Sequence, residues 1–402
     1  MPATQPVERW GEDYDIFDPG YVEEPYPIWD ELRLKCPVAH SDRWGGSFMP
    51  VRYEDVSAVA HDTEHFTSDQ VTVVLPDMAR QIELGLGDIK APPITSDPPQ
   101  HQSDRRLILP AFSPKAVAVY ETITRALCTD LIDAMLPAGR GDAATGYAQQ
   151  IPVRVIATML GIPDSMAPTF TEWVRGLLEL GLQDEEIRLE SLMTVSKYFA
   201  EQVADRKLNP KDDLISELLA AEVNGQPVSD DQVVGTCNLL LVAGIDTTWS
   251  AIGSSLFHLA THPEDRRRLV AEPDLMPVAI EEFLRAYSPV TMARVVKHEV
   301  EINGRRMCPG ELVLLSFPAA NRDPEVFERA DEVIIDRARN RHIAFGAGIH
   351  RCVGSNLARM ELRVAIEEWL KRVPEFSLED PAAVTWAGGQ VRGPRTLPVV
   401  FG

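Results

Sequence analysis

The sequence predicts a mainly α-helical protein with small β-sheets at its edge, and three observations support this fold class. Most segments carry apolar residues at helical spacing, and the prolines fall between these segments, where helices end. One helical pattern is unusually long and continues from Ser229 to Thr261. The strand-like patterns are short, at residues 48–53, 293–302, 311–317 and 397–401. We expect a single domain over residues 1–402, because no repeat or linker-like stretch divides the chain.

The composition is typical of a soluble globular protein with a large core and an acidic surface. The net charge is −22, from 61 acidic and 39 basic residues, which argues against a general nucleic-acid-binding protein. The N-terminus lacks an apolar signal segment, and the longest apolar run, residues 239–245, is far shorter than the ~18 residues that span a membrane. Five scattered cysteines do not suggest a disulfide framework. We therefore expect a cytoplasmic protein with reduced thiols and no membrane association.

Residues 67–95 form the least regular stretch of the chain, with an apolar start followed by glycines and prolines. Long apolar loops inside compact domains are often functional, although a plain surface loop has the same composition. The helix that follows places His101 and Arg105 four residues apart, and so on one face. Two cationic side chains there suit an anionic partner such as a carboxylate, although a solvated helix start is the more common role.

The long helical pattern has a clear start and an unusual middle. Ser229 and Gln232 form a capping-box-like start, and about 30 residues make a helix of roughly 45 Å, long enough to cross the molecule. In its middle, residues 243–248 read Ala-Gly-Ile-Asp-Thr-Thr, and a carboxylate buried there is costly unless it is paired or functional. Either Asp246 and Thr247 serve a function, or Asp246 forms a structural ion pair and Thr247 bonds back to a carbonyl.

The next two features read as ordinary structure when taken alone. Glu282 and Arg285 place opposite charges three residues apart on a helix, where a surface pair is the usual result. The second and third strand patterns then flank Asn303 and Gly304, a dipeptide typical of a hairpin turn.

Cys352 lies in a glycine-rich loop directly before another helical pattern. A thiol at a helix N-terminus faces unpaired N–H groups that favour its thiolate, which can act as a nucleophile or as a metal ligand. His350 is only two residues away and poorly placed as a base, and the chain has no Cys-x-x-Cys pair for zinc. A single thiolate suits haem iron, because the porphyrin supplies four nitrogens, while a buried structural cysteine is the plain alternative.

The spacing Phe345-x-x-Gly348-x-x-x-Cys352-x-Gly354 resembles the cysteine-ligand loop of the cytochrome P-450 family, the haem-thiolate monooxygenases. Further stretches resemble the family in the same order along nearly the whole chain. They are His101 with Arg105, residues 243–247, Glu282 with Arg285, and residues 321–327. The resemblance implies the cytochrome P-450 fold, in which haem b (iron protoporphyrin IX) lies between the long central helix and the helix after the cysteine loop.

The resemblance also implies roles for individual residues. Cys352 would be the axial ligand of the haem iron, in a loop that includes Phe345 and Gly348. Asp246 would relay protons, and Thr247 would hydrogen-bond to oxygen in the active site. The side chains expected to hold the two haem propionates are His101, Arg105, Arg294 and His350. The expected structural triad is Glu282, Arg285 and Arg337, with Arg339 as the alternative third member.

The substrate side of the haem follows from position in the resemblance. The stretch 71–94 would cap the haem, and a pair of helices near residues 165–205 would form a mobile lid. The residues expected to line the pocket are Leu239, Val242, Ala243, Val290, Met292 and Val391. They are largely apolar and so suggest a hydrophobic substrate.

The resemblance implies a monooxygenase that inserts one atom of O2 into a hydrophobic small molecule, by hydroxylation, dealkylation or epoxidation. No fused reductase is visible, so we expect a monomer that receives electrons from NAD(P)H through a separate reductase and a ferredoxin or flavodoxin. The arginines near the cysteine loop that we expect to include part of the docking patch are Arg105, Arg106, Arg351, Arg359 and Arg363. The alternatives are a peroxide-using or substrate-rearranging enzyme and a haem sensor without turnover, and the intact Asp246–Thr247 pair speaks against both.

Overall fold

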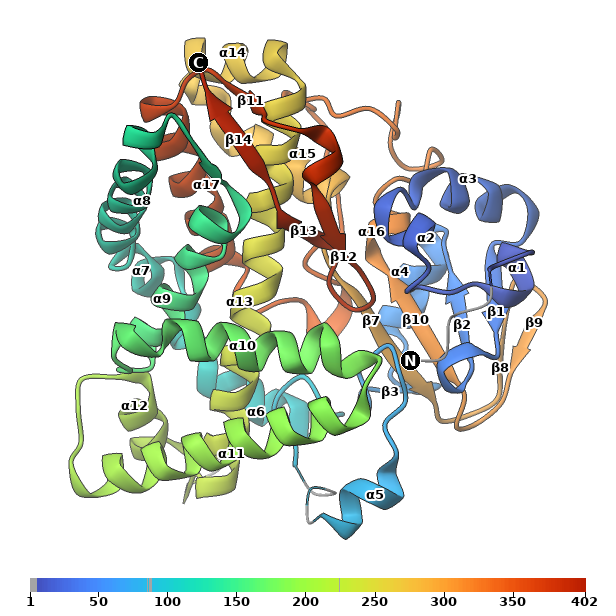
Figure 1. Ribbon diagram of the computed structural model, residues 1–402. Helices are drawn as coiled ribbons and strands as arrows, with labels where there is room; N and C mark the ends of the chain where they lie inside the picture. Colours follow the sequence, from blue (N-terminus) through green and yellow to red (C-terminus); the bar gives the residue numbers. More distant parts are fainter. Residues whose placement is uncertain (1–5, 85, 87–88, 224) are drawn as a thin grey trace.

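The computed structural model describes residues 6–84, 86, 89–223 and 225–402 and is shown in Figure 1. Most helices gather on one side of the molecule, around a long central helix. The first helices and a five-stranded sheet lie on the other side. The predicted fold class, mainly α with small sheets, is confirmed.

The central helix, α13 (Asp230–Thr261), has the bounds that the sequence predicts. The Ser229 side chain caps it by accepting a hydrogen bond from the backbone N–H of Gln232 at 3.2 Å. In the described part of the chain, α13 is the one helix long and apolar enough to cross a membrane. However, 72% of its apolar window is buried inside the protein, as the core helix of a globular domain requires.

Four further helices build the main core with α13. They are α8 (Glu121–Met135), α9 (Gln150–Met159), α15 (Met276–Ala286) and α17 (Ser355–Arg372). Three of them pack directly on α13, whereas α8 packs on α17 and α9. Large buried aromatic side chains pack in this core, among them Tyr147 and Trp369, whose ring centroids lie 4.8 Å apart. This packing holds the middle of α13 and the start of α17 in fixed positions.

Two long helices cross the central helix in the region where a lid is expected (Figure 1). They are α10 (Ala167–Leu178) and α11 (Glu185–Leu208), and both pack on α13. Residues 179–184 connect them through a short 3₁₀ turn. We refer to α10, α11 and this connection as the lid.

The larger sheet has the strand order β1-β2-β10-β7-β3. Its strands are β1 (Val38–Ser41), β2 (Ser47–Pro50), β3 (Phe66–Thr67), β7 (Thr291–Val296) and β10 (Leu312–Ser316). The pair β2–β10 is parallel and the other pairs are antiparallel. The sheet therefore contains three of the four predicted strand regions, and the fourth is β14 (Pro398–Phe401).

The predicted turn at Asn303 and Gly304 is present, with positive φ values of 48° and 74°. It joins two short strands, β8 (Val300–Ile302) and β9 (Arg305–Met307), rather than the longer runs on either side. Those longer runs become β7 and β10, which pair with each other. The strand expected over residues 293–302 is thus divided in two.

Small sheets near the C-terminus bring the last strands against the helical core. One has the order β11-β14-β4, with β4 (Arg140–Asp142) and β11 (Phe376–Leu378). Another pairs β12 (Thr385–Ala387) with β13 (Gly393–Thr396). A separate pair in mid-chain, β5 (Glu222–Val223) with β6 (Gln226–Pro227), directly precedes α13. The remaining helices are α1 (Trp10–Asp13), α2 (Pro19–Glu23), α3 (Tyr26–Lys35), α4 (Tyr53–His61), α5 (Met78–Glu83), α6 (Gln100–Ile108), α7 (Pro114–Ala118), α12 (Leu214–Ala220), α14 (Pro263–Ala271) and α16 (Phe317–Ala320).

Candidate active site at the central helix and the cysteine loop

The cysteine loop is a tight structure whose shape depends on glycine. The backbone N–H of Cys352 donates to the carbonyl oxygen of Phe345 at 2.7 Å and closes the loop. Gly348 has φ +67°, and a Cβ there would overlap the carbonyl oxygen of Ala60 at the end of α4. Glycine therefore meets two needs at this position, a left-handed backbone and close packing against α4.

The thiol of Cys352 faces the interior of the protein. Its side chain is exposed. Nevertheless, the surrounding protein desolvates the thiol and raises its pKa, against the opposing effects of the Gly354 N–H and of nearby arginines. Both observations hold if Cys352 faces an internal hollow instead of the outer surface. Arg105, Arg351 and Arg359 are the arginines that favour the thiolate.

One face of the central helix also opens into internal space. Leu239, Ala243 and Thr247 follow one another at four-residue spacing, and so form a stripe. Ala243 is exposed and its two stripe neighbours are partly exposed, although α13 runs through the core. The Thr247 hydroxyl donates to the carbonyl oxygen of Ala243 at 2.8 Å, which is the back-bonded geometry that the sequence left open. The stripe thus presents a hydroxyl to the hollow.

Asp246 points away from this stripe and is completely buried. Arg395 of β13 pairs with it at 3.0 Å, and the Ser250 hydroxyl donates to it at 3.2 Å. Burial raises the pKa of Asp246, and Arg395 is the largest influence in the opposite direction. The structural ion pair that the sequence offered as an alternative is therefore present.

The four residues expected to hold carboxylates form a cluster of cationic groups. The rings of His101 and His350 lie 4.4 Å apart, and the Nε2 atom of His101 is buried without a hydrogen-bond partner in the described structure. Burial lowers the pKa of Arg294 to about 10. Burial and the neighbouring Arg294 lower the pKa of His350 to about 3. Arg105 and Arg294 lower the pKa of both histidines, while Asp97 and Asp104 oppose this at His101, and Asp97 favours the charge on Arg294.

The cluster makes polar contacts mainly with neutral groups. His350 contacts the Ser68 hydroxyl at 2.9 Å, Arg105 donates to the Arg351 carbonyl at 2.5 Å, and Arg294 donates to the Ala293 carbonyl at 2.7 Å. None of its four members forms an ion pair with another described side chain. A group that carries two carboxylates and offers iron to a thiolate fits this donor set, as haem b does.

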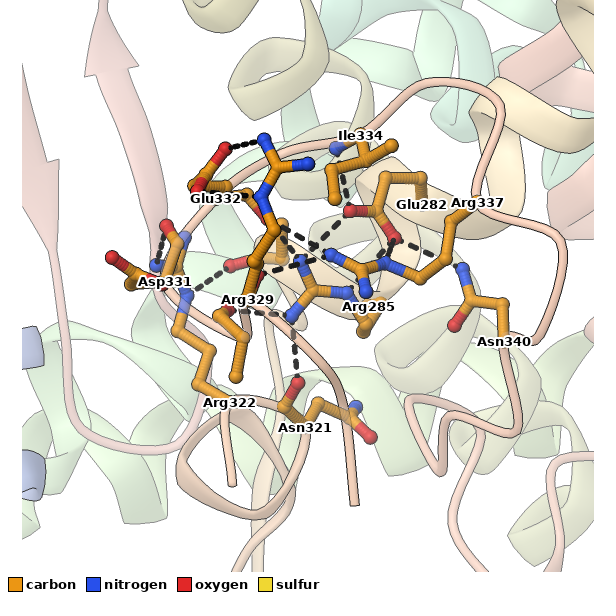
Figure 2. A network of polar contacts seen from close by, with 12 residues as sticks. Glu282, Arg285, Asn321, Arg322, Arg329, Asp331, Glu332, Ile334, Arg337 and Asn340 are labelled. Atoms are coloured by element: carbon orange, nitrogen blue, oxygen red, sulfur yellow. Dashed lines mark hydrogen bonds and ion pairs between the residues drawn. The ribbon is translucent and has the colours of Figure 1, made fainter. Parts of the chain in front are cut away.

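The segment before the cysteine loop is anchored by a buried ion-pair network, shown in Figure 2. Glu282 and Arg285 of α15 are both fully buried and lie 2.8 Å apart. Arg337 donates to the second oxygen of Glu282 at 2.9 Å, whereas Arg339 is exposed. Arg285 also donates to the backbone carbonyls of Asn321, Ala330 and Glu332. The network therefore fixes residues 321–337 against α15.

Comparison with known proteins identifies the family. A model described as Cytochrome P-450 matches residues 164–382, more than half of the chain. This chain belongs to the cytochrome P-450 family. It is 34% identical over 389 residues to the mycinamicin IV hydroxylase/epoxidase of Micromonospora griseorubida. This alignment covers 95% of the present chain and 94% of the relative. The chain is also 32% identical to the methyl-branched lipid omega-hydroxylase of Mycobacterium tuberculosis, over 98% of this chain and 93% of that protein.

A solved structure has the same fold over nearly its full length. The structure of cytochrome P-450 CREJ in complex with (4-ethylphenyl) dihydrogen phosphate has a TM-score of 0.89 and 30% identity to this chain. The match covers 97% of this chain and 99% of that one. Family membership makes this P-450 a haem b protein and a haem-thiolate monooxygenase that acts on hydrophobic substrates. Bacterial members of the family receive electrons from redox partner proteins.

The expected pocket residues of this P-450 do not all face the hollow. Leu239, Ala243 and Val242 of α13 are exposed or partly exposed, and so are Val290 and Met292. Val391, in contrast, is only 2% exposed and forms a β-bridge with Val290. Its side chain is therefore packed against its neighbours and does not face the hollow in this structure. Part of the expected capping loop, residues 85, 87 and 88, lies outside the described residues.

Sequence reasoning missed Arg395, the cation that pairs with Asp246, and Glu179, which pairs with the same arginine. Arg395 lies 149 residues away along the chain in a four-residue strand, and Glu179 follows the last residue of α10. No motif marks either residue. The one available signal was the buried carboxylate itself, which requires a cation without indicating which one.

Proposed function

We propose that this P-450 hydroxylates or epoxidises a hydrophobic small molecule, with Cys352 as the axial ligand of the haem iron. The observation that carries the proposal is the pairing of Thr247 with Asp246 at the middle of α13. The first presents a hydroxyl to the internal hollow, and the second is a buried carboxylate on the adjoining face. A haem protein that only binds ligands has no need of a costly buried acid beside this hydroxyl.

When bound, haem b supplies the activation of dioxygen, so that one oxygen atom enters the substrate and the other leaves as water. His101, Arg105, Arg294 and His350 would hold its propionates, since the two arginines of the cluster donate to backbone carbonyls and form no ion pair with a described side chain. Phe345 and Gly348 shape the loop that presents the thiolate.

Formation of water consumes protons, and the residues of α13 would deliver them. Asp246 would take protons from solvent, and Thr247 would pass them into the hollow through its hydroxyl. The hydrogen bond from Thr247 to the Ala243 carbonyl, 2.8 Å long, fixes the hydroxyl in place. A raised pKa suits Asp246 to this role, because it makes the carboxylate more able to bind a proton before passing it on.

Electrons would come from NAD(P)H through a separate reductase and a ferredoxin or flavodoxin. A cleft of about 380 Å³ beside the cysteine loop supports a docking site, because its walls include α7 and the start of α17. Exposed apolar side chains lie near it, with Val119 66% exposed and Val278 39% exposed. A small acidic redox protein would cover this apolar rim.

The structure leaves fewer unpaired arginines in the basic patch expected beside the cysteine loop. Arg359 is bound to Glu281 and Arg363 to Glu121, so neither offers a free charge. Arg106 and Arg351 are exposed, and no ion pair involves either of them in the described part of the chain. Charge reversal at both should slow reduction by ferredoxin at low salt, while reversal of the distant Arg306 should not. Equal reduction rates in wild type, in the Arg106 and Arg351 double variant and in the Arg306 variant would contradict the docking site.

We also propose a cytoplasmic monomer, in keeping with the acidic surface and with relatives of the same length. Light scattering of the purified protein tests the oligomeric state. A mass consistent with one chain of 44.6 kDa is expected, and a mass of two chains would contradict it.

Oxygen labelling tests the proposed reaction. The holoenzyme would be supplied with ferredoxin, reductase, NAD(P)H and ¹⁸O2, together with a panel that contains a macrolide, a branched-chain fatty acid and a steroid. This choice follows the relatives, which include the mycinamicin IV and lipid hydroxylases and a steroid C26-monooxygenase. A product with one ¹⁸O atom is expected for a ligand that shifts the haem spin state. The proposal would be contradicted if ligands shift the spin state but none of them yields a product that contains ¹⁸O.

A further inference from the structure

Arg395 is the centre of an ion-pair network on the side of α13 that faces away from the hollow. Its Nη2 atom contacts Asp246 at 3.0 Å, its Nη1 donates to the Ser250 hydroxyl at 3.2 Å, and its Nε donates to Glu179 at 2.8 Å. The guanidinium also lies over the Trp249 ring, 4.4 Å from its centroid. One side chain thus joins the carboxylate in mid-helix to the lid.

The backbone of β13 is built to bring Arg395 this close. A Cβ at Gly393 would overlap the Cβ of Ser250, one helical turn after Asp246. A Cβ at Gly253 would lie 2.8 Å from the ring of Pro394. Two glycines, one on the strand and one on the helix, therefore allow β13 to lie directly against α13.

The third member of the network belongs to the lid. Glu179 directly follows α10, and its carboxylate contacts both Arg175 and Arg395 at 2.8 Å. Glu179 is therefore shared between a lid arginine and the arginine that holds Asp246. Any movement of the end of α10 away from β13 must break the bond between Glu179 and Arg395.

We propose that Arg395 is a positioning residue that couples closure of the lid to the availability of Asp246 as a proton carrier. The inference rests on the proposed role of Asp246 as a proton carrier and adds that the position of the lid regulates this role. With the lid in place, Glu179 takes part of the charge of Arg395, which leaves Asp246 more able to bind a proton. When the end of α10 moves away, Arg395 acts on Asp246 alone and holds it as a carboxylate. Proton delivery is then favoured when the lid closes over substrate.

The electrostatic influences on Asp246 agree in sign with this coupling. Burial raises its pKa, Arg395 lowers it, Glu179 raises it, and Ser250 and Arg175 lower it. These are the groups that face Asp246 from α13, from β13 and from the lid. Removal of Arg395 and removal of the Glu179 charge must therefore shift the pKa of Asp246 in opposite directions.

Both substitutions, in contrast, should affect the lid in the same direction. Arg395→Met and Glu179→Gln each weaken the bond that ties α10 to β13. In the ferric holoenzyme without turnover, hydrogen–deuterium exchange over residues 173–184 should rise about tenfold in both variants, because a charge-assisted hydrogen bond no longer resists opening. Arg140→Met serves as the control, because it removes an exposed arginine of β4 that pairs with Glu379. It should leave this exchange unchanged.

The second readout is the pH dependence of coupling, measured as product formed per NAD(P)H consumed. The midpoint should move to higher pH in Arg395→Met and to lower pH in Glu179→Gln, with Arg395→Lys between wild type and Arg395→Met. A merely structural role would move both midpoints in the same direction or not at all. Either of those results, or unchanged lid exchange in both variants, would overturn the coupling.

Asp246→Asn separates this inference from the proposal on which it rests. If Asp246→Asn leaves coupling unchanged, the proton-relay role of Asp246 fails, and the coupling inference fails with it. If Asp246→Asn uncouples the enzyme while Arg395→Met and Glu179→Gln keep the wild-type profile, the relay stands and the role of Arg395 is overturned.

Discussion

Arg337 donates a hydrogen bond from its Nε atom to Glu282 at 2.9 Å, although 55 residues separate the two along the chain. Glu282 is fully buried and also carries Arg285, so that one carboxylate serves two guanidinium groups (Figure 2). The pair links α15 to the segment that leads into the cysteine loop. It therefore connects the stability of the core to the position of Cys352.

Removal of Glu282 should destabilise the protein strongly. Glu282→Ala leaves two buried guanidinium groups without a counter-charge, which should lower the free energy of unfolding by about 3–5 kcal/mol. Urea unfolding followed by circular dichroism measures this change. Glu299→Ala, which removes an exposed partner of Arg306, is the control and should unfold like wild type. Equal midpoints for the two variants would show that the buried network does not stabilise the fold.

The cysteine loop should tolerate a methyl group at one glycine and not at another. Gly348→Ala requires a left-handed backbone and places a Cβ into the Ala60 carbonyl, so the loop should distort and haem retention should fall. At Gly354 the backbone has φ −77°, and the nearest atom to a new Cβ is 3.8 Å away. Gly354→Ala should therefore keep its haem. The ratio of haem to protein after purification measures both, and equal ratios would contradict this account of the loop.

Thr247→Ala should uncouple electron consumption from product formation. Loss of the hydroxyl that faces the hollow should lower product per NAD(P)H by about tenfold or more, with the electrons appearing as hydrogen peroxide. Thr247→Ser retains the hydroxyl and should recover most of the coupling. Thr248→Ala alters a neighbouring hydroxyl that is only 5% exposed, and it should behave like wild type. Tight coupling in Thr247→Ala would favour an enzyme that uses peroxide or rearranges its substrate.

The histidines of the cationic cluster predict an acid sensitivity of the haem-free protein. The pKa of His350 falls from 6.5 to about 3 on folding, mainly through burial and the nearby Arg294. Below pH 6.5 the unfolded state therefore binds a proton that the folded state refuses, so stability falls as pH decreases from 6.5 towards 3. His350→Gln should reduce this slope in apoprotein unfolding curves. A wild-type slope in the variant would mean that His350 does not titrate differently on folding.

Local features of the sequence were sufficient to predict much of the fold. The bounds of α13 follow from the Ser229 cap and from Pro263 after its end, which are signals within a few residues of the boundary. The strand over residues 293–302 was predicted too long, because the turn at Asn303 serves a smaller hairpin. Turn chemistry identifies a hairpin but does not say where each flanking strand begins.

Some residues of the site could also be predicted from short motifs, whereas contacts between distant segments could not. The cysteine loop and the Asp246–Thr247 pair are short motifs and were visible in the sequence. The link from Asp246 through Arg395 to Glu179 depends on the approach of a strand, a helix and the lid, and no local pattern encodes that approach. Val391 was assigned by position alone, and its side chain is almost fully buried in the structure.

The absorption spectrum of the reduced, carbon monoxide-bound protein tests the central claim most directly, because the position of its Soret band reports whether a thiolate ligates the haem iron. Wild type should show the red-shifted band typical of thiolate ligation. Cys352→Ser should lose that band and the monooxygenase activity, while its circular dichroism spectrum should remain that of a folded helical protein. A red-shifted band or full turnover in folded Cys352→Ser would contradict the assignment of Cys352 as the axial ligand.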